Sequence, residues 1–178
     1  MALWGELAAV TAMAGRTCVG LVFLLAALQK IQHWRLLAGV IANYRLLPGW
    51  AVGLAAGLLP PLEMLVAVAL LSAGRQPWLA IAGIALLLVF AAAMAVNIAR
   101  GRTHIDCGCG QEFLAQQLSW ALVGRNLVLG FLLMPSLLAA MPVSLSATLT
   151  GAAAGLAFFL LYLLFNVFSA LPRAHRFA

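Results

Sequence analysis

Apolar residues gather in five long runs along the chain, separated by shorter polar connections. Each run is near the roughly 20 residues that a helix needs to cross a bilayer. We therefore predict an all-α fold, a polytopic membrane helix bundle of four to five transmembrane helices, as a single domain over residues 1–178. The predicted spans are residues 5–31, 50–73, 77–99, 118–140 and 146–170, and the connections long enough to host a site are residues 32–49 and 100–117.

Composition supports a membrane protein. The chain is 66% hydrophobic and 8% charged, which is far outside the usual range of a soluble domain. The net charge is +6, but the basic residues lie between the apolar runs rather than along one face. This placement favours a role in membrane topology over nucleic-acid binding. The expected partner is the lipid bilayer, with no nucleic acid.

The polar connection between the third and fourth spans carries two thiols, Cys107 and Cys109, after Asp106. Cysteines one residue apart can form a disulfide only if the backbone between them bends tightly, and Gly108 permits that bend. A strained ring of this kind is easily reduced. The pair is therefore suited to thiol–disulfide exchange rather than to structural cross-linking.

A metal site is the weaker interpretation of this loop. His104 gives a His-x-x-Cys-x-Cys arrangement, but zinc or copper needs three or four ligands and no other Cys or His lies nearby in sequence. Cys18 falls in the middle of the first span, about 20 Å from the face that bears the loop. We expect Cys18 to be a small buried residue with no resolving role.

Two ionisable residues, Arg16 and Glu63, fall inside predicted spans at a similar depth, roughly 20 Å from the same face. A lone charge there costs at least about 2.5–3.5 kcal/mol, so we expect them to pair. Two roles stay open for such a pair: an ion pair that fixes helix register, or a polar cavity for a quinone or a proton path. Pro60 and Pro61 are expected to kink or start the helix near Glu63.

Polar residues also mark the ends of the third and fourth spans. Asn97 is expected to make a capping hydrogen bond, and Arg125, beside Asn126, to reach the membrane interface. The functional alternative is that a guanidinium near Cys107 or Cys109 favours the thiolate, which is the nucleophile in exchange. Both interpretations stay open.

Six motifs in a fixed order resemble the MauE family of DoxX-like, redox-associated membrane proteins. The resemblance covers residues 16–133, and it is most specific in the thiol loop and the Leu-Ser-Trp and Arg-Asn elements that follow. Many relatives have Cys-Gly-Cys-Phe-Gly, whereas Gly110 directly follows the second thiol here. The motifs are Leu28-Gln29-Lys30, Tyr44-Arg45-Leu46-Leu47-Pro48, Pro61-Leu62-Glu63, Asn97-Ile98-Ala99-Arg100-Gly101-Arg102, Asp106-Cys107-Gly108-Cys109 and Leu118-Ser119-Trp120-Ala121-Leu122-Val123-Gly124-Arg125-Asn126.

The resemblance implies a multi-pass protein of the bacterial inner membrane that is required to mature the tryptophylquinone-bearing β (small) subunit of methylamine dehydrogenase. The implied partner is the thioredoxin-like protein MauD. As a thiol–disulfide oxidoreductase component, the chain would use Cys107 and Cys109 as its redox pair. The candidate supporting residues are Arg125, Asn126, Asn97, Asp106, Glu63 and Arg16; no cofactor is assigned, and a quinone stays open.

Two alternatives use the same membrane scaffold differently. The first is a non-catalytic anchor, chaperone or export factor for the same subunit, in which the thiols are dispensable. The second is a transporter with Arg16 and Glu63 on its polar path, although no internal repeat is apparent.

Two arguments disagree about which side of the membrane the thiol loop faces. Basic residues are concentrated on the loop side, and the positive-inside rule then puts the loop in the cytoplasm. Maturation of a periplasmic subunit favours the opposite face, and we favour the periplasm. The basic residues on the loop side are Lys30, Arg35, Arg45, Arg100, Arg102, Arg173 and Arg176, with Arg75 on the other side.

Overall fold

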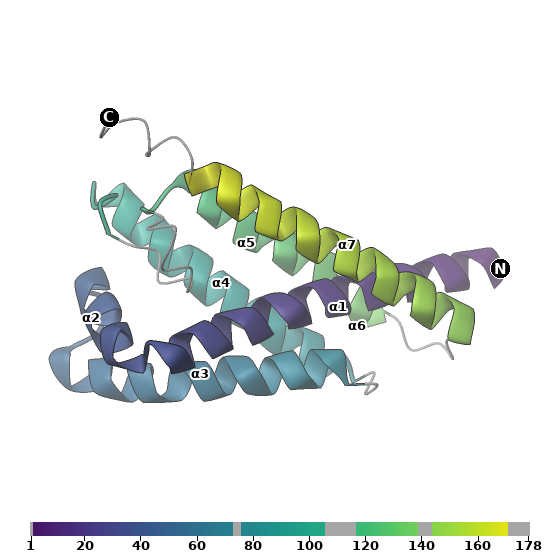
Figure 1. Cartoon of the computed structure of the whole chain (residues 1–178), viewed down its shortest axis with the longest axis horizontal. Coiled ribbons are helices and arrows are strands. Elements are labelled where there is room, and N and C mark those ends of the chain that lie inside the picture. The colour runs from purple at the N-terminus through teal and green to yellow at the C-terminus, as the bar shows by residue number, and fades with distance from the viewer. Residues whose placement is uncertain (1, 73–75, 106–116, 139–143, 171–178) are drawn as a thin grey trace.

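The computed structural model describes residues 2–72, 76–105, 117–138 and 144–170 (Figure 1). This part of the chain is helical and contains no strand, which confirms the all-α prediction. Five helical segments are long and apolar enough to cross a membrane. The helices are α1 (Ala2–Gln32), α2 (Trp34–Tyr44), α3 (Gly49–Leu71), α4 (Pro77–Ala99), α5 (Trp120–Leu133), α6 (Pro135–Leu138) and α7 (Leu145–Ala170).

The fourth span is built from two helices. Helix α5 ends at Leu133 and α6 begins at Pro135, whose ring nitrogen has no hydrogen to donate to the preceding turn. The backbone tightens at the junction, where Met134 N donates to the Phe131 carbonyl at 3.0 Å. The two helices together cover Trp120–Leu138, a 19-residue span.

Helix α2 lies where the sequence analysis expected a polar connection. Its 11 residues are too few to cross a bilayer. Leu37 is buried, whereas Trp34 and Leu36 are exposed. The helix packs against the first turns of α3 at one end of the bundle (Figure 1). Such a helix, with one face on the protein and apolar residues on the other, suits the membrane interface.

Helix α3 passes through two prolines without ending. It begins at Gly49 and continues through Pro60 and Pro61 to Leu71, so of the two expectations for these prolines, a kink or a helix start, the start is wrong. Proline lacks the N–H group that would bond a carbonyl one turn earlier, and neighbouring helices make that loss tolerable in a membrane. Glu63 therefore projects from a continuous helix.

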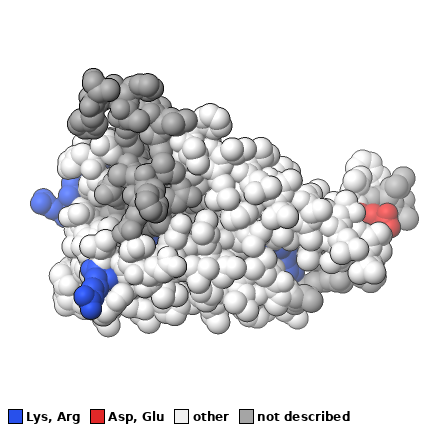
Figure 2. Space-filling view, in the orientation of Figure 1, with Lys and Arg blue, Asp and Glu red and all other residues white. Residues whose placement is uncertain are grey.

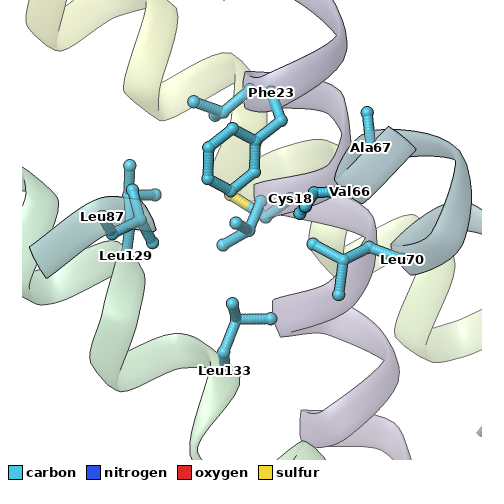
Figure 3. Packing of buried hydrophobic residues seen from close by; sticks show 10 residues of the cluster. Cys18, Phe23, Val66, Ala67, Leu70, Leu87, Leu129 and Leu133 are labelled. Carbon is cyan, nitrogen blue, oxygen red and sulfur yellow. The ribbon is translucent and has the colours of Figure 1, made fainter. Parts of the chain in front are cut away.

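Helix α1 lies at the centre of the bundle, between α3 and α7, and also contacts α5 and α6 (Figure 1). It runs antiparallel to α3 and parallel to α7. Its middle supplies one side of the main apolar core, which Figure 3 shows from close by. The buried residues of that core are Cys18, Val19, Val22, Phe23, Val66, Ala67, Leu70, Leu87, Leu129 and Leu133.

Glycines bring α7 and α1 into backbone contact. A Cβ on Gly151 would lie 2.8 Å from the Val10 carbonyl oxygen, and one on Gly155 would lie 2.6 Å from the Ala14 carbonyl oxygen. Small residues allow this approach, which drives helix association in lipid, where burial of apolar surface does not. Gly151 and Gly155 therefore serve helix packing.

The outer surface has the character of a bilayer-facing protein. Figure 2 shows a mostly white surface, with blue atoms chiefly at the end that carries α2. Tryptophans lie exposed near the helix ends, as expected for an aromatic belt at the two interfaces. They are Trp4, Trp34, Trp50, Trp78 and Trp120.

Replacing Gly155 with alanine is expected to destabilise the bundle, because the new Cβ would overlap the Ala14 carbonyl oxygen 2.6 Å away. Overpacking of this kind costs about 1–3 kcal/mol. The matched control is Gly53→Ala in α3, where a Cβ meets no atom within 4 Å. Thermal unfolding in one detergent should give a lower melting temperature for Gly155→Ala than for the control. Equal melting temperatures would contradict the close packing.

Candidate functional site

The thiols themselves, Cys107 and Cys109, lie outside the described residues, as does Asp106. The two ends of their segment are described and lie together. Leu118 N donates to the Ile105 carbonyl at 3.1 Å, and both side chains are buried. Ile105 and Leu118, on either side of this segment, are therefore held together in the bundle.

A small apolar cluster holds both ends of the thiol segment against α4 and α5. Ile105 and Leu118 pack in it with Met94 of α4 and Leu122 of α5, and Tyr44 of α2 lies against the same cluster. Burying this apolar surface stabilises the junction of the two segment ends. The base of the segment is thus part of the folded bundle.

Arg102, shortly before the thiol segment, joins α2 to α4. Its Nη2 donates to the Asn43 carbonyl at 2.9 Å, and its Nη1 donates to the Asn97 Oδ1 at 3.2 Å. Nη1 also lies 3.4 Å from the Tyr44 carbonyl. Because Asn43 and Tyr44 end α2, the guanidinium meets carbonyls at the negative end of that helix.

Asn97 supports this arrangement from the last turn of α4. The side chain is fully buried, its Nδ2 donates to the Ala93 carbonyl at 3.0 Å, and its Oδ1 accepts from Arg102. The Asn97 carbonyl also accepts from the Arg102 backbone N–H at 2.9 Å. Asn97 therefore fixes the position of Arg102 through both its backbone and its side chain.

A buried ion pair links α1 to α3. Lys30 Nζ lies 2.8 Å and 2.9 Å from the two carboxylate oxygens of Glu63. Glu63 is 0% exposed and Lys30 is 8% exposed. The ammonium also lies 5.7 Å from the centre of the Phe90 ring on α4, a favourable cation–π distance. Three helices thus meet at one charge pair.

The expected pairing of Arg16 with Glu63 is corrected by this geometry. Arg16 is buried, but its Nε donates to the Leu70 carbonyl at 3.2 Å and its Nη2 to the Ser72 carbonyl at 3.1 Å. These carbonyls end α3, and a guanidinium there complements the helix dipole. Arg16 therefore caps α3, while Lys30 neutralises Glu63.

The depth estimate failed because the two helices are staggered. It counted residues inward as if the first and second spans started at one membrane level. In the structure, Gly20 of α1 lies against Leu70 and Leu71, so the first turns of α3 extend past the end of α1 at Gln32. Helix α2 packs there instead.

Arg125 points toward α7. Its Nη1 donates to Asn166 Oδ1, and its guanidinium carbon lies 5.2 Å from the centre of the Tyr162 ring. Neighbouring Asn126 is buried and donates through Nδ2 to the Leu122 carbonyl at 3.1 Å. The proposed influence of Arg125 on a thiolate stays a prediction, because the thiols lie outside the described residues.

Two further sequence-based expectations concern Cys18 and His104. Cys18 is 1% exposed in the main core, which confirms its reading as a small buried residue. His104 is exposed. In the part of the chain that the structure describes, no three His, Cys, Asp or Glu side chains are grouped so as to hold a metal ion.

Three residues with structural roles were missed or misplaced by sequence reasoning. Lys30 was assigned to the loop side as a topology signal, whereas it reaches into the bundle to Glu63. Arg102 was treated in the same way, and nothing in its sequence context marks it as a link between helices. Asn166 was not considered, although a lone polar residue in an apolar span is itself a signal of an internal partner.

These features define a multi-pass membrane helix bundle with a buried ion pair and, at one end, a contact between the residues that flank the thiol segment. Comparison with known proteins identifies the family of this membrane protein. The family model for methylamine utilisation protein MauE matches residues 8–139. The chain belongs to the MauE family, as its motifs indicated.

Relatives with this name match most of the chain. The MauE protein of Paracoccus denitrificans is 44% identical over 162 residues, which cover 89% of this chain and 87% of that protein. The MauE protein of Paracoccus versutus is 40% identical over 163 residues, covering 90% and 88%. That of Methylorubrum extorquens is 40% identical over 143 residues, covering 77% and 76%. No solved structure matches the chain.

Truncating Lys30 to methionine is expected to destabilise the protein by about 3–5 kcal/mol, because the buried Glu63 carboxylate loses its cation. The double variant Lys30→Met/Glu63→Gln should recover much of that loss, since no buried charge of the pair remains. Chemical unfolding of the purified variants in one detergent measures both effects. A Lys30→Met protein as stable as the parent would rule out the ion pair as a stabilising contact.

Proposed function

We propose that this protein is a thiol–disulfide relay component of the bacterial inner membrane that matures the methylamine dehydrogenase β subunit. Cys107 and Cys109 are its exchange pair, and a thioredoxin-like MauD protein is its partner. Membership of a family named for methylamine utilisation supports the pathway. The observation that carries the proposal is the anchored base of the thiol segment, where Leu118 N meets the Ile105 carbonyl.

The proposed chemistry is a two-step exchange. A thiolate of the pair attacks a disulfide of the partner, forming a mixed disulfide while the other partner sulfur leaves as a thiolate. The second cysteine of the pair then attacks the mixed disulfide, which yields a Cys107–Cys109 disulfide and releases the partner as a dithiol. Two electrons pass from the pair to the partner, and the reverse sequence passes them back.

The anchored base suits such exchange. Arg102, Asn97 and the Ile105–Leu118 contact hold the base of the segment at the loop end of the bundle. A thiol pair on a fixed base pays less orientational entropy when it meets a partner than one on a free chain. Partners at the membrane surface would meet the pair there.

We also propose that the thiol segment faces the periplasm, where the β subunit matures. Two of the basic residues that argued for the cytoplasm, Lys30 and Arg102, make contacts within the protein that account for their presence. These two residues therefore give less support to the positive-inside argument for a cytoplasmic loop.

Labelling of Cys109 tests this orientation in a variant that also carries Cys18→Ser and Cys107→Ser. A membrane-impermeant maleimide added to intact spheroplasts should label Cys109, because a periplasmic thiol is accessible without disruption. Labelling in permeabilised cells alone would place the segment in the cytoplasm. The triple variant without Cys109 is the background control.

Substitution of the thiols tests the relay itself. Cys107→Ser, Cys109→Ser and the double variant should each abolish active dehydrogenase while leaving the protein in the membrane, because exchange needs both sulfurs. Cys18→Ser is the matched control and should retain activity, since Cys18 is buried in the main core. Fully assembled enzyme with the double variant would refute the relay and favour the anchor or chaperone alternative.

A further inference from the structure

An open groove runs between α5 and α7 over the surface of α1. Both helices pack against α1, but in the described part of the chain they make few contacts with each other. A cavity of about 430 Å³ lies between them, within the usual size range of small-molecule sites. Cys18 and Leu129 form part of its inner lining, and Val128 and Leu161 are among the residues on its two walls.

The groove is open toward lipid. Val128 of α5 is 60% exposed and Leu161 of α7 is 58% exposed, and neither lies near the polar ends of the bundle. Because the surrounding surface is apolar, the medium at this opening is the hydrocarbon of the bilayer. A ligand of this groove would therefore enter sideways from the membrane, and its body must be apolar.

One polar group interrupts the apolar lining. Arg125 crosses the groove from α5 to reach Asn166 and the ring of Tyr162 on α7. It follows the interfacial Trp120 by five residues on the same helix, so it lies about 8 Å deeper along the axis. A guanidinium carries five N–H donors and can serve several acceptors. The groove therefore offers hydrogen-bond donors at the depth of the hydrocarbon.

The walls beside Arg125 suit a flat ring. A Cβ on Gly124 would meet no atom within 4 Å, so the α5 wall is bare backbone with open space over it at this position. Phe158, Tyr162 and Phe165 line the opposite wall on α7. Aromatic side chains pack well against planar rings in offset or edge-to-face arrangements.

We propose that this groove binds a membrane quinone. A ring carbonyl accepts a hydrogen bond from Arg125, the ring lies over Gly124, and the isoprenoid tail follows Val128 toward Leu132. A phospholipid fits less well, because its phosphate belongs at the interface level of Trp120, above Arg125. The test of this site does not depend on the relay. The open quinone alternative thus moves from Arg16 and Glu63 to the α5–α7 groove.

Binding of decylubiquinone to the full-length protein in nanodiscs tests the proposal. Saturable binding is expected, with Arg125→Gln weaker by roughly tenfold, the loss typical of one hydrogen bond to a charged group. Gly124→Leu and Val128→Trp, which both add volume inside the groove, should also weaken binding. Leu127→Phe is the matched control, because it adds volume on the exposed, lipid-facing side of the same helix outside the groove.

The result of this titration either supports or overturns quinone binding in the groove. Weakened binding by either well-folded filling variant, with Leu127→Phe unchanged, supports the groove as the site. Binding that is absent, or that is unchanged in the folded filling variants, overturns the proposal, whatever the effect of Arg125→Gln. Displacement of the quinone by an anionic phospholipid at equal concentration would also overturn it, because a lipid would then be the occupant.

Discussion

The requirement that every charge inside the bilayer finds a partner within the protein governs this structure. Lys30 and Glu63 meet it with each other, and their contact ties α1 to α3 beside Phe90 of α4. Arg16 meets it differently, by donating to carbonyls that end α3, and Arg102 makes the same kind of contact with carbonyls that end α2 at one end of the bundle. The polar contacts thus set the stagger of the helices, while glycines on α7 set the distance of closest approach to α1.

This arrangement produces two features with functional potential. At one end of the bundle, Arg102 and the Ile105–Leu118 contact give the thiol segment a fixed base. Along one side, the separate packing of α5 and α7 on α1 leaves a groove that Arg125 crosses. Helix α5 adjoins both features, because it begins two residues after Leu118 and its middle lines the groove.

Hydrophobic runs were enough to predict the five spans, because crossing a bilayer demands long apolar helices. They did not predict α2, since an 11-residue interfacial helix is too short and too mixed to stand out. The partner of Glu63 was also missed, because counting along helices cannot reveal their stagger. The thiol pair was found from its spacing and its family motifs, and its chemistry stays a prediction.

The redox state of Cys107 and Cys109 in living cells tests the account most directly. In a Cys18→Ser background, thiols are trapped by acid, alkylated with a mass tag and resolved by gel shift, in cells with and without the MauD-like partner. The account predicts that removing the partner shifts the pair between disulfide and dithiol, because the two proteins exchange electrons. An identical redox state in both strains would contradict it.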